Sequence, residues 1–220
     1  GYVIIKDEDI VSDIKEMYGL KPKIEELGIL ETNNSFNSIT FFYPEKGQSM
    51  DFNDLEGLID GIHRCLGDNQ GIIEVNNGKT VRGYDFIYSI VKSVDKNGVQ
   101  YFLRINIKKD DNILEIYGNF EESGMTGIRE SIAASIADKA GICELGSDKW
   151  SQDPYDPEYK RGKCKNLAEK EGLDALFPES PLSQARKFLL AILKDEIVME
   201  NKDKMDEKVP LEKFFVDECR

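Results

Sequence analysis

The chain has 220 residues, 40% of them hydrophobic, so it can bury a substantial core, and we expect a single domain. Its 42 acidic and 29 basic residues give a formal net charge of −13. So acidic a balance repels phosphate groups at long range, and nucleic acid is therefore not expected as the main partner. The sequence has no run of about 18 or more apolar residues, which predicts that no helix spans a membrane.

The N-terminal residues do not read as a signal peptide, because the apolar stretch 2–5 is short and charged residues follow it. We therefore expect a cytoplasmic protein, with export after removal of a leader as the alternative. The four cysteines have neither disulfide-framework nor zinc-site spacing, so we interpret them as bystander thiols. The alternative is a reactive Cys164 whose pKa is lowered by the basic residues Arg161, Lys163 and Lys165.

The first third of the chain predicts helices around one strand. Apolar residues at helical spacing indicate a helix over 8–18, and a second, short helix is expected over 22–28. Residues 38–43 are rich in β-forming side chains and predict a strand. A further helix is predicted over 53–66, with Asn53 as its N-cap.

The hydrophobic period then changes to two, which indicates strands. Asn77-Gly78 and Asn97-Gly98 are strong hairpin-turn signals between such segments. The predicted strands are 71–76, 79–94, 99–108 and 113–120. Together they predict an antiparallel meander.

Two helices are predicted after the meander. The first covers about 124–140, with Ser123 as its cap and Gly141 as its stop. Its narrow apolar stripe is of the kind that usually faces a core, and consists of Met125, Ile128, Ile132, Ile136 and Ala140. The second covers 181–198 and begins with Pro181, a favourable first helical residue.

Strands framed by helices predict an α+β fold, in which an antiparallel meander sheet has helices packed on both faces. We expect one α+β domain over 1–199 and a charged C-terminal tail over 200–220. Within the domain, 1–35 are expected to be a helical extension and 36–142 the sheet-and-helix core. Residues 143–199 are expected to combine an irregular segment with the final helix.

The order strand, helix, meander, helix resembles the PsbP-like fold, which the Ran-binding Mog proteins share with bacterial relatives. The residues that carry the resemblance are Ile39–Pro44, the opening strand that ends in Tyr-Pro, and Ile116–Gly127, which lead from the last strand into a helix. The resemblance covers about residues 36–142. The resemblance implies an α/β/α sandwich and a mostly non-enzymatic role, as a partner-binding protein, a chaperone or an accessory subunit. It assigns no functional residue.

Residues 150–186 contain the single Trp and four of the seven prolines. Such a segment is neither a regular helix or strand nor a flexible linker, and ordered irregular segments often carry binding surfaces. It predicts a surface that recognises another protein. The candidate binding residues are Trp150, Tyr155, Tyr159, Arg161, Phe177 and Arg186. The alternative is that the aromatic side chains only cover the core.

Few residues suggest catalysis. His63 is the only histidine, and we interpret it as a residue at the edge of its helix. Asp153, Asp156 and Glu158 are spaced like part of a Ca²⁺ or Mg²⁺ site, although Asp-Pro pairs also form turns. The glycine-rich residues 124–127 open a helix and are better explained by a tight turn than by an anion site.

The sequence therefore favours a non-catalytic protein-binding, accessory or chaperone-like protein without a cofactor, whose partner is another protein. One alternative is a metal-dependent hydrolase that uses Asp153, Asp156 and Glu158. Another is an acidic inhibitor or immunity-type protein that neutralises a basic partner. The sequence does not indicate which oligomeric state the protein has.

Overall fold

The structure is a computed structural model. It describes residues 3–4, 23–31, 35–43, 50–109, 112–144, 147 and 149–194. The helix predicted over 8–18 and the tail predicted over 200–220 lie outside the described residues.

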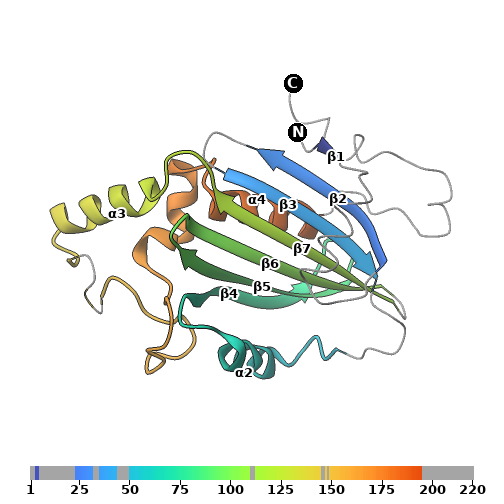
Figure 1. The fold of residues 1–220 in the computed structure, drawn as a ribbon. Helices are drawn as coiled ribbons and strands as arrows, with labels where there is room; N and C mark the ends of the chain where they lie inside the picture. Colours follow the sequence, from blue (N-terminus) through green and yellow to red (C-terminus); the bar gives the residue numbers. More distant parts are fainter. Residues whose placement is uncertain are drawn as a thin grey trace.

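A seven-stranded antiparallel sheet forms the centre of the fold (Figure 1). Its strand order is β1-β2-β3-β7-β6-β5-β4. The strands are β1 (Val3–Ile4), β2 (Lys23–Glu31), β3 (Ser35–Tyr43), β4 (Gln70–Lys79), β5 (Asp85–Asp95), β6 (Gly98–Lys109) and β7 (Asn112–Glu122). Strands β4 to β7 pair in chain order, so the predicted antiparallel meander and the α+β fold class are confirmed.

The prediction of a short helix over 22–28 is wrong, because Lys23–Glu31 form strand β2. This segment contains good helix formers such as Glu and Leu, but it pairs along its length with β3. Helix propensity is a weak preference, and pairing with a neighbouring strand overrides it here.

One of the two predicted hairpin turns is displaced. Asn77-Gly78 lie inside β4, and the chain reverses over Thr80–Tyr84, where Gly83 N–H donates to the Thr80 carbonyl at 2.8 Å. The second turn lies one residue before the predicted Asn97-Gly98, at Lys96–Asn97, and Gly98 begins β6 with a φ of 131°. Only glycine adopts that conformation easily, which explains its position there.

Helices cover both faces of the sheet, as predicted. Helix α4 (Pro181–Leu193) packs on one face, against side chains of β3, β4, β5, β6 and β7. Helix α2 (Leu55–Cys65) packs on the opposite face of β4, over Ile72 and Val75 (Figure 1). The N-cap of α2 is Asp54 rather than Asn53, since Asp54 Oδ1 accepts the Gly57 N–H at 2.8 Å.

A β-bulge in β4 directs two consecutive side chains toward α4. The register shifts between Ile72 and Glu74, which leaves Ile73 as the extra residue. Ile73 belongs to the core under α4, and Glu74 bonds to Arg186 of α4. The bulge therefore places one carboxylate on the face of the sheet that α4 covers.

Helix α3 (Ile128–Lys139) follows β7 and projects beyond the ends of the strands (Figure 1). It begins later than predicted, and its N-cap is Gly127 instead of Ser123. Gly127 has a φ of 71°, and Gly141 ends the helix with a φ of 64°, as the sequence predicts for that end. In the described part of the chain, no helix is long and apolar enough to cross a membrane.

Residues 150–167 form a loop whose two ends pair with each other. Ser151 and Asn166 form an antiparallel bridge, and the Leu167 N–H donates to the Trp150 carbonyl at 2.9 Å. Two short 3₁₀ helices, η1 (Leu167–Glu169) and η2 (Glu171–Leu176), then lead to α4.

This loop lies along β4, the last strand of the sheet. The Lys163 N–H donates to the Gln70 carbonyl at 2.8 Å. The Tyr155 hydroxyl accepts the Val75 N–H at 2.5 Å and donates to the Val75 carbonyl at 2.9 Å. Backbone groups on the outer side of β4 are thereby satisfied by the loop.

We expect Gly71→Ala to destabilise the fold by about 2 kcal/mol, because a Cβ at Gly71 would lie 1.9 Å from the Lys163 carbonyl oxygen. Gly172→Ala is the matched control, since nothing lies within 4 Å of its added Cβ and a change below about 1 kcal/mol is expected. Urea unfolding measures both variants. Equal stabilities would contradict the close packing of the loop on β4.

Candidate functional site

Arg186, one of the predicted binding residues, is buried and connects α4 to three other elements. Its Nε donates to Glu74 Oε2 at 3.0 Å, and its Nη1 lies 3.1 Å from both carboxylate oxygens of Asp174. Its Nη2 donates to the Glu169 carbonyl at 2.9 Å. Burial alone would lower the pKa of Arg186, but the carboxylates of Glu74 and Asp174 outweigh it and raise that pKa.

Arg129 occupies the buried side of α3 and has an acceptor for each of its five N–H groups. Its shortest contacts join Nε to the Ala168 carbonyl at 2.6 Å and Nη2 to Asp174 Oδ1 at 2.7 Å. The acceptors are the carbonyls of Ala168 and Lys170, the hydroxyls of Ser180 and Ser183, and the carboxylate of Asp174. Arg129 is thus committed to internal contacts.

Glu169 is the buried carboxylate that anchors η1 to the sheet. Lys92 Nζ donates to both of its oxygens, at 2.9 and 2.7 Å, and the Tyr101 hydroxyl donates at 3.0 Å. The Asn166 N–H adds a bond of 2.7 Å. Burial, and after it the charge of Glu169, raises the pKa of Tyr101 well above its usual value, so that hydroxyl stays a donor.

Two of the three predicted metal ligands, Asp153 and Asp156, use their carboxylates to stabilise turns of the backbone. Asp153 is buried, and its Oδ1 accepts the N–H groups of Tyr155 and Asp156 at 2.9 and 3.0 Å. Asp156 Oδ1 accepts the Glu158 N–H at 2.9 Å. Among the described residues, no three His, Cys, Asp or Glu side chains are grouped so that they could hold a metal ion. The Asp-Pro turn interpretation fits this geometry.

His63 pairs with Asp153, which the sequence does not reveal. His63 Nε2 lies 3.0 Å from Asp153 Oδ2, and the imidazole stacks on the Tyr159 ring with centroids 4.3 Å apart. His63 and Asp153 are 90 residues apart, so no local pattern connects them. The pair holds the loop against the last turn of α2.

The other predicted binding residues do not gather on one surface. Trp150 is buried in a cluster with alanines of α3, and Tyr159 is half-buried against His63. Tyr155 and Arg161 are exposed, and binding by them stays a prediction. Burial raises the pKa of the Tyr155 hydroxyl, although its bond to Val75 opposes the shift.

The lowered pKa suggested for Cys164 is wrong. Burial, followed by the charge of Asp153, raises the pKa of this thiol, and the attraction of Lys92 and Lys160 does not compensate. Its sulfur points toward the carbonyls of Tyr159 and Arg161.

Helix α3 turns its large apolar side chains to the solvent. Ile132 and Ile136 are 43% and 47% exposed, and Met125, before the helix, is 72% exposed. The buried residues are Arg129, Ala133 and Ala137. The apolar stripe predicted from the sequence therefore faces away from the core, because the small alanines and the fully bonded arginine occupy the inner side.

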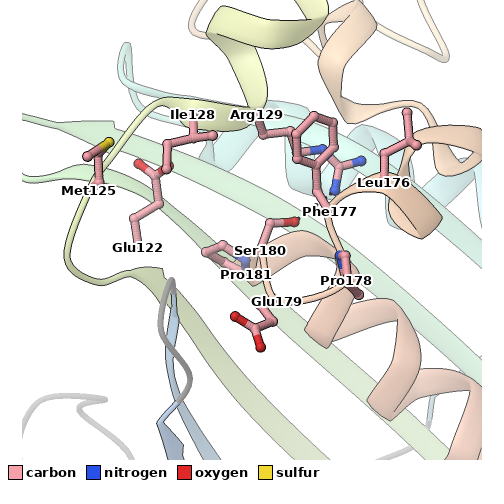
Figure 2. A pocket seen from close by; sticks show the side chains of 10 residues that line it. All are labelled: Glu122, Met125, Ile128, Arg129, Leu176, Phe177, Pro178, Glu179, Ser180 and Pro181. Carbon is pink, nitrogen blue, oxygen red and sulfur yellow. Dashed lines mark hydrogen bonds between the residues drawn. The ribbon is translucent and has the colours of Figure 1, made fainter.

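A cavity of about 180 Å³ lies between the start of α3 and the segment that enters α4. Figure 2 shows Met125 and Ile128 on one side and Leu176, Phe177 and Pro178 on the other. Ligand sites for small molecules usually exceed about 300 Å³, so this pocket suits one protruding side chain better. Phe177 is thus a predicted binding residue that lines this cavity.

In the turn before α3, the N–H of the N-cap residue Gly127 is already bonded to a carboxylate of the protein, so it is not available to an external anion. Glu122 Oε1 accepts the Gly127 N–H at 2.8 Å, and its Oε2 accepts the Val99 N–H at 3.0 Å. Gly124 and Gly127 both have positive φ angles, which agrees with the tight-turn interpretation of this segment.

No family model matches the chain, and no curated protein matches it in sequence. Among solved structures, the chain is similar to PA94 from Pseudomonas aeruginosa, described as a protein of unknown function. The two are 6% identical, the match covers 66% of this chain and 97% of that chain, and the TM-score is 0.31. So weak a likeness indicates neither a shared function nor a shared site.

We expect Lys92→Met to destabilise the protein by about 3 kcal/mol or more, because it leaves the buried Glu169 carboxylate without its cation. The double variant with Glu169→Gln should recover part of this loss. Lys79→Met removes an exposed pair with Asp85 and should cost less than about 1 kcal/mol. Chemical unfolding gives all three values, and similar losses for Lys92→Met and Lys79→Met would contradict the buried pair.

Glu130 gives a prediction about pH. Burial raises its pKa, and its Oε2 is buried and has no hydrogen-bond partner among the described residues. Below the unfolded pKa of 4.5, Glu130 is protonated in both the folded and the unfolded state, so its burial does not lower the free energy of unfolding further. As the pH rises from there through the higher folded pKa, stability is lost. We therefore expect Glu130→Gln to be more stable than wild type at neutral pH and equal to it well below pH 4.5. The exposed variant Glu158→Gln should lack this pH-dependent gain.

Proposed function

We propose that this chain is a non-catalytic protein-binding or accessory protein with a PsbP-like core. Its binding surface would be the α3 apolar surface, which consists of Met125, Ile128, Ile132, Ile136, Leu176 and Phe177. We further propose that the partner is a protein rather than nucleic acid, since the charge of −13 repels phosphates. The cytoplasmic location expected from the sequence is part of this proposal.

The observation that carries the proposal is the orientation of α3. A helix at the surface of a globular protein normally turns its apolar stripe inward, but here Ile132 and Ile136 face the solvent. Leu176, across the pocket, is 62% exposed as well. Single exposed apolar residues are ordinary, whereas two on one helix together with others beside a pocket at its start are typical of a surface that another protein covers.

The same region is held rigidly from beneath. Arg129 bonds to both 3₁₀ helices and to the start of α4, and its guanidinium lies 5.8 Å from the centroid of the Phe177 ring. A surface that is already ordered loses little conformational entropy on binding. The pocket beside Phe177 supplies the kind of site into which an anchor side chain packs.

The loop aromatics fit a binding role less well. Trp150 and Arg186 are committed to the interior, and the Tyr155 hydroxyl is bonded to Val75. Their contacts support the alternative that this segment covers and fastens the core.

We expect the double variant Ile132→Ser/Ile136→Ser to keep its stability within about 0.5 kcal/mol and to lose its partner, because both side chains are exposed. Affinity capture from cells that express the chain, followed by mass spectrometry, measures the loss. Val81→Ser is the control, since Val81 is 76% exposed on the turn between β4 and β5. Equal capture of the same proteins by all three chains would overturn the proposed surface.

A further inference from the structure

We propose that the segment bound by the α3 apolar surface is an amphipathic helix of the partner protein, with Lys or Arg on both sides of its apolar stripe. This inference rests on the proposed function and adds the chemistry of the partner.

The spacing of the isoleucines of α3 favours a helical partner. Ile132 and Ile136 are exposed, and Ile128 is half-buried. Ile128, Ile132 and Ile136 recur every four residues, which makes one ridge along α3. Such ridges pack into the grooves of a second helix, and an amphipathic helix laid into an apolar groove is a common mode of recognition. The 180 Å³ pocket at the N-terminal end of the ridge would receive one larger side chain of that helix (Figure 2).

The charges around the surface favour a basic partner. The two segments that form it, 121–144 and 170–180, contain eight acidic and three basic residues. Arg129 and Asp174 pair with each other. Of the remaining charged residues, four acidic and two basic ones are exposed, namely Asp138, Glu144, Glu171 and Glu179, and Lys139 and Lys170. An acidic rim around an apolar centre selects a partner with the opposite rim and repels one with the same charge.

The same argument disfavours two other occupants. A second copy would bring one acidic rim against another, which opposes association. Residues 195–220 contain nine acidic and five basic residues, so this segment also has the wrong sign of net charge. Both occupants are nevertheless distinguished in the test.

The test uses two labelled, helix-forming peptides with Leu at every fourth position, one with Lys and one with Glu beside the leucines. Fluorescence anisotropy with the full chain should show the Lys peptide binding at least about tenfold more tightly than the Glu peptide. Added salt should weaken that binding, because it screens the rim charges. Ile132→Ser/Ile136→Ser should lower the affinity for the Lys peptide by about tenfold or more, whereas Val81→Ser should leave it unchanged.

Each contrary result identifies what fails. Equal affinities for the two peptides, or no binding of either, overturn the basic-helix inference, while the proposed function stands if partner capture still depends on Ile132 and Ile136. If the Lys peptide binds the double variant as tightly as it binds the wild-type chain, the proposed surface is wrong. A dimer in sedimentation that the double variant dissociates would assign the surface to a second copy. A large gain in affinity on Phe214→Ser/Phe215→Ser would assign it to the chain's own C-terminal segment.

Discussion

The carboxylate of Asp174 is shared by two buried arginines, and much of the structure depends on this arrangement. Arg129 comes from α3 and Arg186 from α4, and both donate to Asp174 in η2. A guanidinium cannot lose its charge at any accessible pH, so a buried one must be surrounded by acceptors. The irregular path of 166–180 supplies most of them, namely backbone carbonyls, the Ser180 hydroxyl and this carboxylate. Ser183 of α4 and Glu74 of β4 supply the others.

This demand also explains the unusual orientation of α3. Arg129 can reach its acceptors only if its side of the helix faces the 3₁₀ segment, and Ala133 and Ala137 on the same side permit a close approach to Trp150. The isoleucines then face outward as a geometric consequence. The stability of the arginine cluster and the exposure of the proposed binding surface thus have one cause.

Local patterns predicted the elements whose signals are local: β3, the meander, α2, and both the start of α4 and the end of α3. They failed where distant residues decide. Strand β2 exists because β3 is available to pair with it, and α3 is oriented by acceptors 39 to 54 residues away in the sequence. Of the candidate site, the sequence identified Phe177 and the apolar stripe, but not which way that stripe faces.

The contact between Tyr155 and Val75 has a consequence for how this protein meets other chains. The N–H and C=O of Val75 are among the groups through which a foreign strand would extend the sheet at β4, and one phenol hydroxyl occupies both of them. At Val75 the edge of the sheet therefore offers no free backbone pair to a foreign strand. A chain that approaches β4 at this point meets the loop, so contact there depends on shape and charge rather than on backbone pairing.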